Sequence, residues 1–157
     1  MPEGWEGFFV AEAGAAAALA GLLFVAVSIN LGRILEFPNL PLRAIEALTA
    51  FVSILAVATI GLTPHQSALA YGVEIAAAGA VAWLIQTIAL VRGKGPGGAR
   101  TALRVLLNQL PALPFVAAGG LVCAGYPGGL AWLLPGVLLS FCAGIVGAWV
   151  LLVEIQR

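Results

Sequence analysis

The sequence predicts an all-α integral membrane protein, a bundle of about five transmembrane helices joined by short loops. Of its 157 residues, 62% are hydrophobic and only 9% are charged, whereas a soluble domain of this length carries about 25% charged residues. The mean hydropathy is +1.08. Five apolar stretches, each long enough to cross a bilayer as a helix, follow one another in what we interpret as a single transmembrane domain, residues 1–157.

Prolines and glycines separate the five predicted helices. Proline-containing segments, which disfavour helix, follow the first helix at residues 36–41 and the second at Thr63–Pro64. Glycine-rich segments follow the third helix at residues 92–98 and the fourth at residues 125–129. Because all the connections are short, we expect neighbouring helices to run antiparallel. The predicted helices cover residues 8–35, 42–62, 66–91, 100–124 and 130–155.

The distribution of basic residues tests the helix count and sets the orientation. With five helices, every Lys and Arg falls on one side of the membrane, in segments 33–43 and 92–104 and at residue 157. Because Lys and Arg favour the cytoplasmic side, we expect the N-terminus outside and the C-terminus in the cytoplasm, in the inner (plasma) membrane of the cell. An alternative with four spans would leave residues 100–124 partly in the interface, but Leu113–Ala124 is too apolar for that position.

Two predicted helices carry small residues along one face. Small residues let transmembrane helices approach closely. Packing within one protomer accounts for at least one of the faces, but two such faces exceed what a small five-helix bundle is expected to bury. We therefore expect a homo-oligomer. The residues are Gly136, Ser140 and Gly144 on the fifth helix and Gly14, Ala18 and Gly21 on the first.

Polar side chains at membrane depth are costly and therefore point to functional residues. They form an inner layer on four helices, about 5–12 Å from the cytoplasmic ends, and a sparser outer layer. Residues 16–27, 75–82 and 115–122 between the layers carry no strongly polar side chain, so we expect an apolar constriction and no ion site at the midplane. The candidates for an ion pathway are Ser28, Asn30, Glu46, Thr49, Ser53, Gln86, Asn108 and Gln109 in the inner layer, with Glu12 and Glu74 in the outer layer.

Most of these candidates have a structural alternative. The amides can hydrogen-bond across helices, and Glu46 can pair with Arg43 or Arg104. Glu74 differs, because no basic residue lies on its side of the membrane. Its carboxyl group is expected to be protonated, or to be partnered by a hydroxyl, by His65 or by a cation. Since burial favours the neutral form of a carboxyl group, Glu74 suits proton binding.

Prolines interrupt two of the predicted helices. Pro111 and Pro114 are expected to break the fourth helix just after Asn108–Gln109, where freed carbonyl groups beside polar side chains can form a binding site. An ordinary proline kink is the alternative interpretation. Pro135 in the fifth helix can be interpreted in the same two ways, as part of a binding site or as an ordinary kink.

No catalytic, metal-binding or nucleotide-binding motif is present in the sequence. His65 is the single histidine, and Cys123 and Cys142 lie at predicted depths too different for a disulfide. The glycines of residues 93–98 lack the order of a P-loop. The basic segment 92–104 is better explained as a contact for anionic membrane lipid. We therefore expect no enzymatic activity, no cofactor, no metal and no nucleic-acid partner.

The apolar run Gly21–Leu31, with the preceding Phe8–Glu12, resembles uncharacterised small bacterial multi-pass membrane proteins. The resemblance covers mainly the first helix. It implies a bacterial multi-pass membrane protein and carries over no activity.

Two functions follow from these patterns. The first is a small oligomeric channel or carrier for a cation or proton, with the polar candidates lining its path. The alternative is a non-catalytic scaffold, assembly factor or regulatory subunit of a larger membrane complex, which the small-residue faces also suit. Carboxylates on three helices favour the first function, because packing alone does not require them.

Overall fold

A computed structural model describes residues 4–93 and 99–155, with the side chains of residues 4–93 and 102–154. This part of the chain is helical and contains no strand. Five of its segments are long and apolar enough to cross a membrane, which confirms the predicted all-α chain with five potential spans. The elements are α1 (Glu6–Ile29), α2 (Leu31–Glu36), α3 (Leu40–Leu62), α4 (Ala68–Arg92), α5 (Ala99–Gln109), α6 (Ala112–Cys123), the 3-10 helix η1 (Gly129–Trp132) and α7 (Leu133–Ile155).

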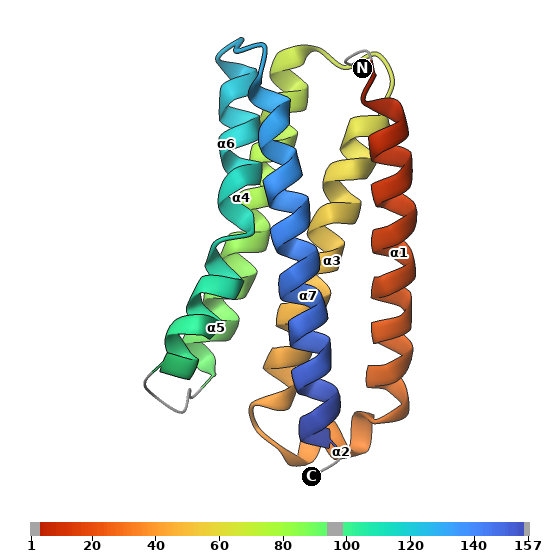
Figure 1. Cartoon of the computed structure of the whole chain (residues 1–157), viewed down its shortest axis with the longest axis vertical. Helices are drawn as coiled ribbons and strands as arrows, with labels where there is room; N and C mark the ends of the chain where they lie inside the picture. Colours follow the sequence, from red (N-terminus) through yellow and green to blue (C-terminus); the bar gives the residue numbers. More distant parts are fainter. Residues whose placement is uncertain (1–3, 94–98, 156–157) are drawn as a thin grey trace.

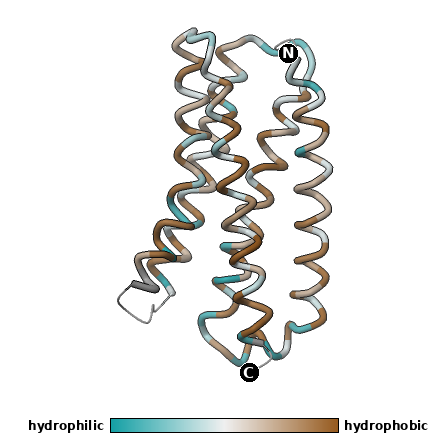
Figure 2. Tube along the Cα trace, viewed as in Figure 1, coloured by the Kyte–Doolittle hydropathy of each residue, from teal (hydrophilic) through white to brown (hydrophobic). Residues whose placement is uncertain are grey.

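Helix α3 lies at the centre of the bundle and packs against α1, α4 and α7 (Figure 1). Helix α4 also packs along α6, which in turn contacts α7. The two termini lie at opposite ends of the bundle, as an odd number of spans requires (Figure 1). We call these the N-terminal end and the C-terminal end. Hydrophilic positions gather at both ends and in the half nearer the C-terminal end (Figure 2).

The first predicted helix is broken at Asn30, where the sequence predicted a continuous helix over residues 8–35. Helix α1 ends at Ile29, and Asn30 adopts φ −102° and ψ 14° before α2 begins. The Asn30 side-chain amide donates a hydrogen bond of 2.8 Å to the carbonyl of Ala26. A short amide side chain that bonds to the backbone competes with the helical ladder, which explains the break.

The fourth span bends at a proline, as predicted. Helix α5 ends at Gln109 and α6 starts at Ala112, with Pro111 immediately before it. Pro111 has no N–H to continue the ladder of α5, and α5 turns away from α7 below this point (Figure 1). Pro114 lies in the first turn of α6 and Pro135 in the first turn of α7. The first-turn N–H groups have no partner within a helix, so neither proline interrupts its helix.

The small-residue face of α7 is used inside the protomer. A Cβ atom at Gly136 would lie 2.7 Å from the ring of Phe115, and one at Gly144 would lie 2.6 Å from the ring of Phe51. Ser140, between these glycines, is fully buried. The glycines therefore allow aromatic rings from α6 and α3 to sit against the α7 backbone.

The small-residue face of α1 is open, in contrast to that of α7. Helix α1 buries Phe9, Ala16 and Leu23, which are spaced seven residues apart, within the two apolar cores of the bundle. Gly14 and Gly21 have no atom outside the helix backbone within 4 Å of an ideal Cβ position, and Ala18 is exposed. The predicted stripe on α1 therefore lies on the surface of the protomer.

Candidate functional site

Two cavities contain five of the ten predicted polar candidates, and the first cavity lies at the C-terminal end. The bend between α5 and α6 accompanies a cavity of about 350 Å³ between α3, α5 and α7, which we call the inner cavity. Its charged and polar lining residues are Arg43, Glu46, Arg104, Asn108 and Glu154. Glu46 and Asn108 were candidates from the sequence, whereas Arg43, Arg104 and Glu154 were not.

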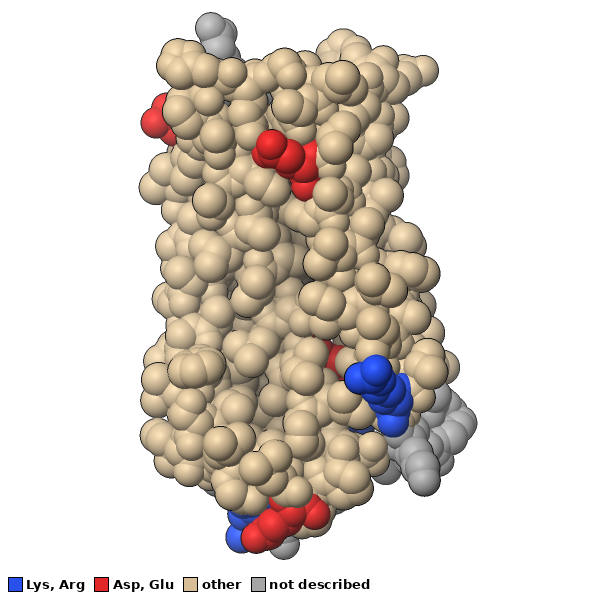
Figure 3. Space-filling model, turned by 180° about the vertical axis from the view of Figure 1, so that it is seen from behind, with Lys and Arg blue, Asp and Glu red and all other residues tan. Residues whose placement is uncertain are grey.

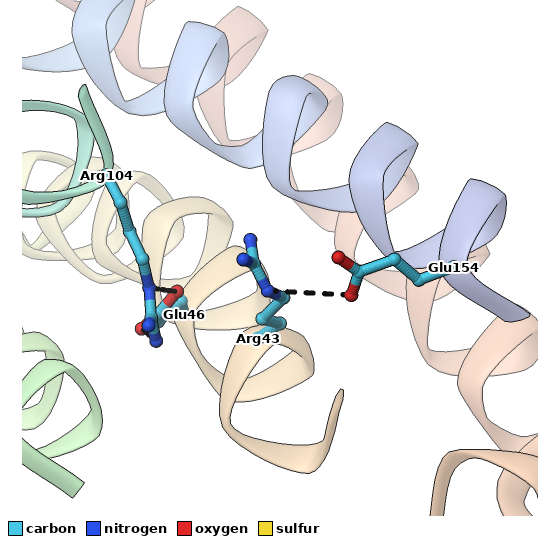
Figure 4. Close-up of polar contacts among 4 residues, drawn as sticks. All are labelled: Arg43, Glu46, Arg104 and Glu154. Carbon is cyan, nitrogen blue, oxygen red and sulfur yellow. Dashed lines mark hydrogen bonds and ion pairs between the residues drawn. The ribbon is translucent and has the colours of Figure 1, made fainter. Parts of the chain in front are cut away.

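Two ion pairs form between lining residues of the inner cavity (Figure 4). Arg104 donates to both carboxylate oxygens of Glu46, through Nη2 and through Nε, the latter at 3.3 Å from Oε2. Both side chains are only 8% exposed. Arg43 Nε lies 3.6 Å from Glu154 Oε2. Of the two partners that the sequence offered Glu46, the structure therefore selects Arg104.

The end of α4 makes room for the Arg104 guanidinium group. A Cβ atom at Gly93 would lie 2.7 Å from Arg104 Nη2. The bidentate pair of Arg104 and Glu46 thus joins α5 to α3 beside Gly93, the C-cap residue of α4. Two parallel hydrogen bonds make such an arginine–carboxylate pair strong. Because the charge of Glu46 is balanced by Arg104, this geometry favours the structural alternative for Glu46.

The remaining inner candidates do not form one continuous layer. Gln109 on α5 and Thr87 on α4 exchange hydrogen bonds of 3.2 and 3.3 Å. Gln86 is 2% exposed. Ser28 and Asn30 each donate 2.8 Å hydrogen bonds to carbonyl groups four residues earlier in the chain. Among the described residues, the side chains of Ser28 and Asn30 therefore bond to the local backbone and not to α3, α4 or α5.

The second cavity is a groove between α3 and α4 of about 560 Å³. Its lining on α3 runs from Ile45 to Ile60, which is about 22 Å at the helical rise per residue. We call it the α3–α4 groove. Its polar lining residues are Thr49, Ser53 and Glu74. The structure thus brings together three of the predicted candidates, from two helices, in one groove.

Glu74 is held by an amide from the connection between α3 and α4. Gln66 Nε2 donates a hydrogen bond of 2.6 Å to Glu74 Oε2. Ser67 caps α4 by accepting a hydrogen bond of 3.2 Å from the N–H of Ala70, which fixes Gln66 just before the helix begins. Among the described residues, the hydrogen-bond partner of Glu74 is therefore an amide, and neither a hydroxyl group nor His65 bonds to it. No regular helical spacing points to this pair, because the two residues are eight positions apart across a helix start.

Charges are distributed unequally between the two ends. In Figure 3 the basic groups lie only in the lower half, towards the C-terminal end, and acidic groups lie without basic neighbours near the top. Glu12 on α1 is half-buried and Glu74 on α4 is exposed. All seven Lys and Arg belong to segments 33–43 and 92–104 and to residue 157. Lys94 and Arg157 lie outside the described residues, as does the side chain of Arg100.

The chemistry of the two cavities differs accordingly. The inner cavity combines two carboxylates with two guanidinium groups, whereas the α3–α4 groove has one carboxylate and two hydroxyls. Among residues 4–93 and 102–154, no group of three or more His, Cys, Asp or Glu side chains is placed to hold a metal ion. Comparison of the chain with protein-family models, curated proteins and solved structures found no match.

Proposed function

We propose that the chain works in a homo-oligomer as a channel or carrier for a proton or small cation, with Glu74 as the binding carboxylate. The observation that carries this proposal is the hydrogen bonding of Glu74 in the α3–α4 groove by a neutral amide. Glu74 lies six residues into α4, about 9 Å along the helix. A carboxylate at membrane depth with no basic partner is costly, and a bound proton or cation would relieve that cost.

The α3–α4 groove supplies a route from Glu74 towards the C-terminal end. Ser53 and Thr49 follow Glu74 along its lining, separated by apolar side chains. An apolar stretch of this kind gates by excluding water. A neighbouring protomer that covered the groove would enclose the route, which is why the proposal includes an oligomer.

The test is ion flux from liposomes that contain the purified protein, with H⁺, K⁺, Na⁺ and Cl⁻ gradients applied separately. We expect flux of a proton or one cation, lost in Glu74→Gln. Glu6→Gln is the matched control, because Glu6 is an exposed carboxylate at the same end of the bundle, and it should leave flux unchanged. Absence of flux from folded, oligomeric protein would overturn the proposal, as would full flux in Glu74→Gln.

The proposed orientation places the N-terminal end on the outer side of the cell membrane, because basic residues favour the cytoplasmic side. Two exposed aromatic residues can report it, each replaced by cysteine in a Cys123→Ser, Cys142→Ser background. Tyr126 is 64% exposed near the N-terminal end, and Phe37 is 44% exposed between α2 and α3 at the opposite end. A membrane-impermeant maleimide should label Tyr126→Cys, and not Phe37→Cys, in intact cells. The reverse pattern would invert the orientation.

A second candidate function, a non-catalytic scaffold or regulatory subunit, is favoured by the open face of α1. Gly7, Gly14 and Gly21 are seven residues apart, and nothing lies within 4 Å of an ideal Cβ at any of them. Each glycine costs a helix about 1 kcal/mol relative to alanine, with no packing gain inside this protomer. Close approach of another helix would supply that gain, and a seven-residue spacing suits a left-handed pair.

The occupant of the α1 face separates the two candidates. Gly14→Leu adds bulk where the protomer has no neighbour, so the fold should persist and only association should change. Gly120→Leu on α6 is the matched control, since Gly120 is also open. We expect native mass spectrometry to show a homo-oligomer that Gly14→Leu dissociates and Gly120→Leu does not. A monomeric chain that carries a different membrane protein, lost in Gly14→Leu, would support the scaffold instead.

A further inference from the structure

The inner cavity has a charged mouth and apolar walls. Arg43 and Glu154 form the mouth, near the start of α3 and the end of α7, at the C-terminal end of the bundle. The lining on α7 runs inward from Glu154 to Ala143, about 16 Å at the helical rise per residue. The volume of about 350 Å³ lies in the range of small-molecule sites. The apolar walls are Leu103 and Leu107 on α5 and Ala143, Val146, Gly147 and Val150 on α7.

The two charges at the mouth are only loosely paired. Arg43 Nε lies 3.6 Å from Glu154 Oε2, which is beyond the range of a good hydrogen bond, and the side chains are 22% and 39% exposed. Figure 4 shows the Arg43 side chain between the Arg104–Glu46 pair and Glu154. Exposed pairs of this kind contribute little to stability. Each charge at the mouth is therefore available to another partner at little cost.

A buried amide without a partner lies deeper in the inner cavity. Asn108 lines the cavity and is 7% exposed, and its side chain forms no hydrogen bond with another residue that the structure describes. It follows Arg104 by four residues on α5, which places it about 6 Å further into the bundle. Unmade hydrogen bonds of buried amides are costly. Because an amide nitrogen donates two hydrogen bonds, Asn108 suits a carbonyl oxygen of a ligand that enters from the mouth.

The mouth, the amide and the walls follow the order of groups in a glycerophospholipid, which has its headgroup at the membrane surface, ester carbonyls below it and hydrocarbon deepest. The charges select the kind of headgroup. Two guanidinium groups and two carboxylates line the cavity, so the lining is neutral as a whole. An anionic lipid would place an unbalanced negative charge beside Glu154, and like charges in contact are costly. A zwitterionic lipid leaves the site neutral.

We propose that the inner cavity binds one phospholipid with a phosphoethanolamine headgroup. The phosphate accepts hydrogen bonds from Arg43, the ammonium group donates to Glu154, and an ester carbonyl accepts from Asn108. An acyl chain lies along the apolar walls, in the space that opens where α5 turns away from α7 (Figure 1). A primary ammonium group donates charge-assisted hydrogen bonds to a carboxylate, whereas the trimethylammonium group of phosphocholine has no N–H to donate. The proposal is independent of ion transport, because the proposed ion route follows the α3–α4 groove.

The experiment measures the binding of phospholipids to delipidated full-length protein in detergent by native mass spectrometry. Phosphatidylethanolamine, phosphatidylcholine and phosphatidylglycerol with the same acyl chains are compared. We expect phosphatidylethanolamine to bind about tenfold more tightly than either of the others, the ratio that one charged hydrogen bond supplies. Free phosphoethanolamine should bind far more weakly than the lipid, because it leaves the apolar walls empty. Equally tight binding of the free headgroup would overturn the lipid and point to a soluble phosphate ester.

Substitutions assign each contact separately. Glu154→Gln should lower the affinity for phosphatidylethanolamine to that for phosphatidylcholine, and leave the latter unchanged. Arg43→Gln and Asn108→Leu should weaken both lipids, because both contain the phosphate and the esters. Arg92→Gln is the matched control, since Arg92 is an exposed arginine on α4 that does not line the inner cavity, and it should leave every affinity unchanged.

Three results would overturn the proposal. The first is equal affinity for the three lipids, and the second is a preference for phosphatidylethanolamine that persists in Glu154→Gln. The third is a loss in Arg92→Gln as large as that in Arg43→Gln, which would indicate general attraction to the surface and no site. Thermal unfolding of each variant checks that the fold is kept. If Asn108→Leu does not fold, Glu154→Gln and Arg43→Gln still decide between these outcomes, because they alter only the loosely paired mouth.

Discussion

The two halves of the bundle treat their carboxylates in opposite ways. In the half nearer the C-terminal end, Glu46 and Glu154 each meet an arginine, and the first of these pairs is bidentate and buried. In the other half, the one hydrogen-bond partner of Glu74 within the described part of the chain is the amide of Gln66. The same type of side chain thus serves as a structural link at one end and as an unneutralised group at the other. The difference between Glu46 and Glu74 in their contacts follows from the position of the arginines.

The largest expected effect breaks the buried pair. Arg104→Ala leaves Glu46 buried without a counter-charge, which typically costs about 3–5 kcal/mol, and it also unties α5 from α3. Replacing both members, as Glu46→Met with Arg104→Met, should restore most of the stability because no charge is then buried. Unfolding in mixed detergent micelles measures both variants. A double variant as unstable as Arg104→Ala would show that the pair adds more than mutual neutralisation.

The spans were predictable from the sequence because apolar length and helix-breaking residues are local signals. The bend at Pro111 was predictable for the same reason, because the missing N–H of proline is also a local signal. The break at Asn30 did not, because an asparagine within a helix either faces away from the backbone or bonds to it, and the sequence does not distinguish these cases.

The site was predictable only in part. The absence of basic residues from one end singled out Glu74 in advance. Its partner Gln66 depends on how the chain enters α4 after Ser67, which is a detail of the turn. Arg43 lies three residues before Glu46 on the same helix, a spacing that allows an ion pair. The sequence therefore offered no reason to prefer Arg104 over Arg43 as the partner of Glu46. Packing against α5 and the space at Gly93 select Arg104 instead, and neither is visible before the helices are assembled.

A smaller effect is expected at the second pair of the inner cavity. Glu154 is 39% exposed and its contact with Arg43 spans 3.6 Å, so solvent and salt screen it. Exposed pairs of this kind contribute about 0–1 kcal/mol. Glu154→Gln should therefore lower stability by less than Arg104→Ala, with a difference from wild type that shrinks as salt is added. A loss as large as that of Arg104→Ala would mean that the two pairs act as one network.

The smallest effect on stability is expected at Glu74. Glu74→Gln keeps the size of the side chain and removes a charge that no basic residue balances, so its unfolding free energy should stay within about 0.5 kcal/mol of wild type, as for surface substitutions. The same variant is expected to abolish flux, whereas the main expected effect of Arg104→Ala is a loss of stability. Unfolding in mixed micelles, measured beside liposome flux, checks both parts. If Glu74→Gln destabilises the protein as strongly as Arg104→Ala, Glu74 is a structural residue like Glu46, and the contrast between the two halves disappears.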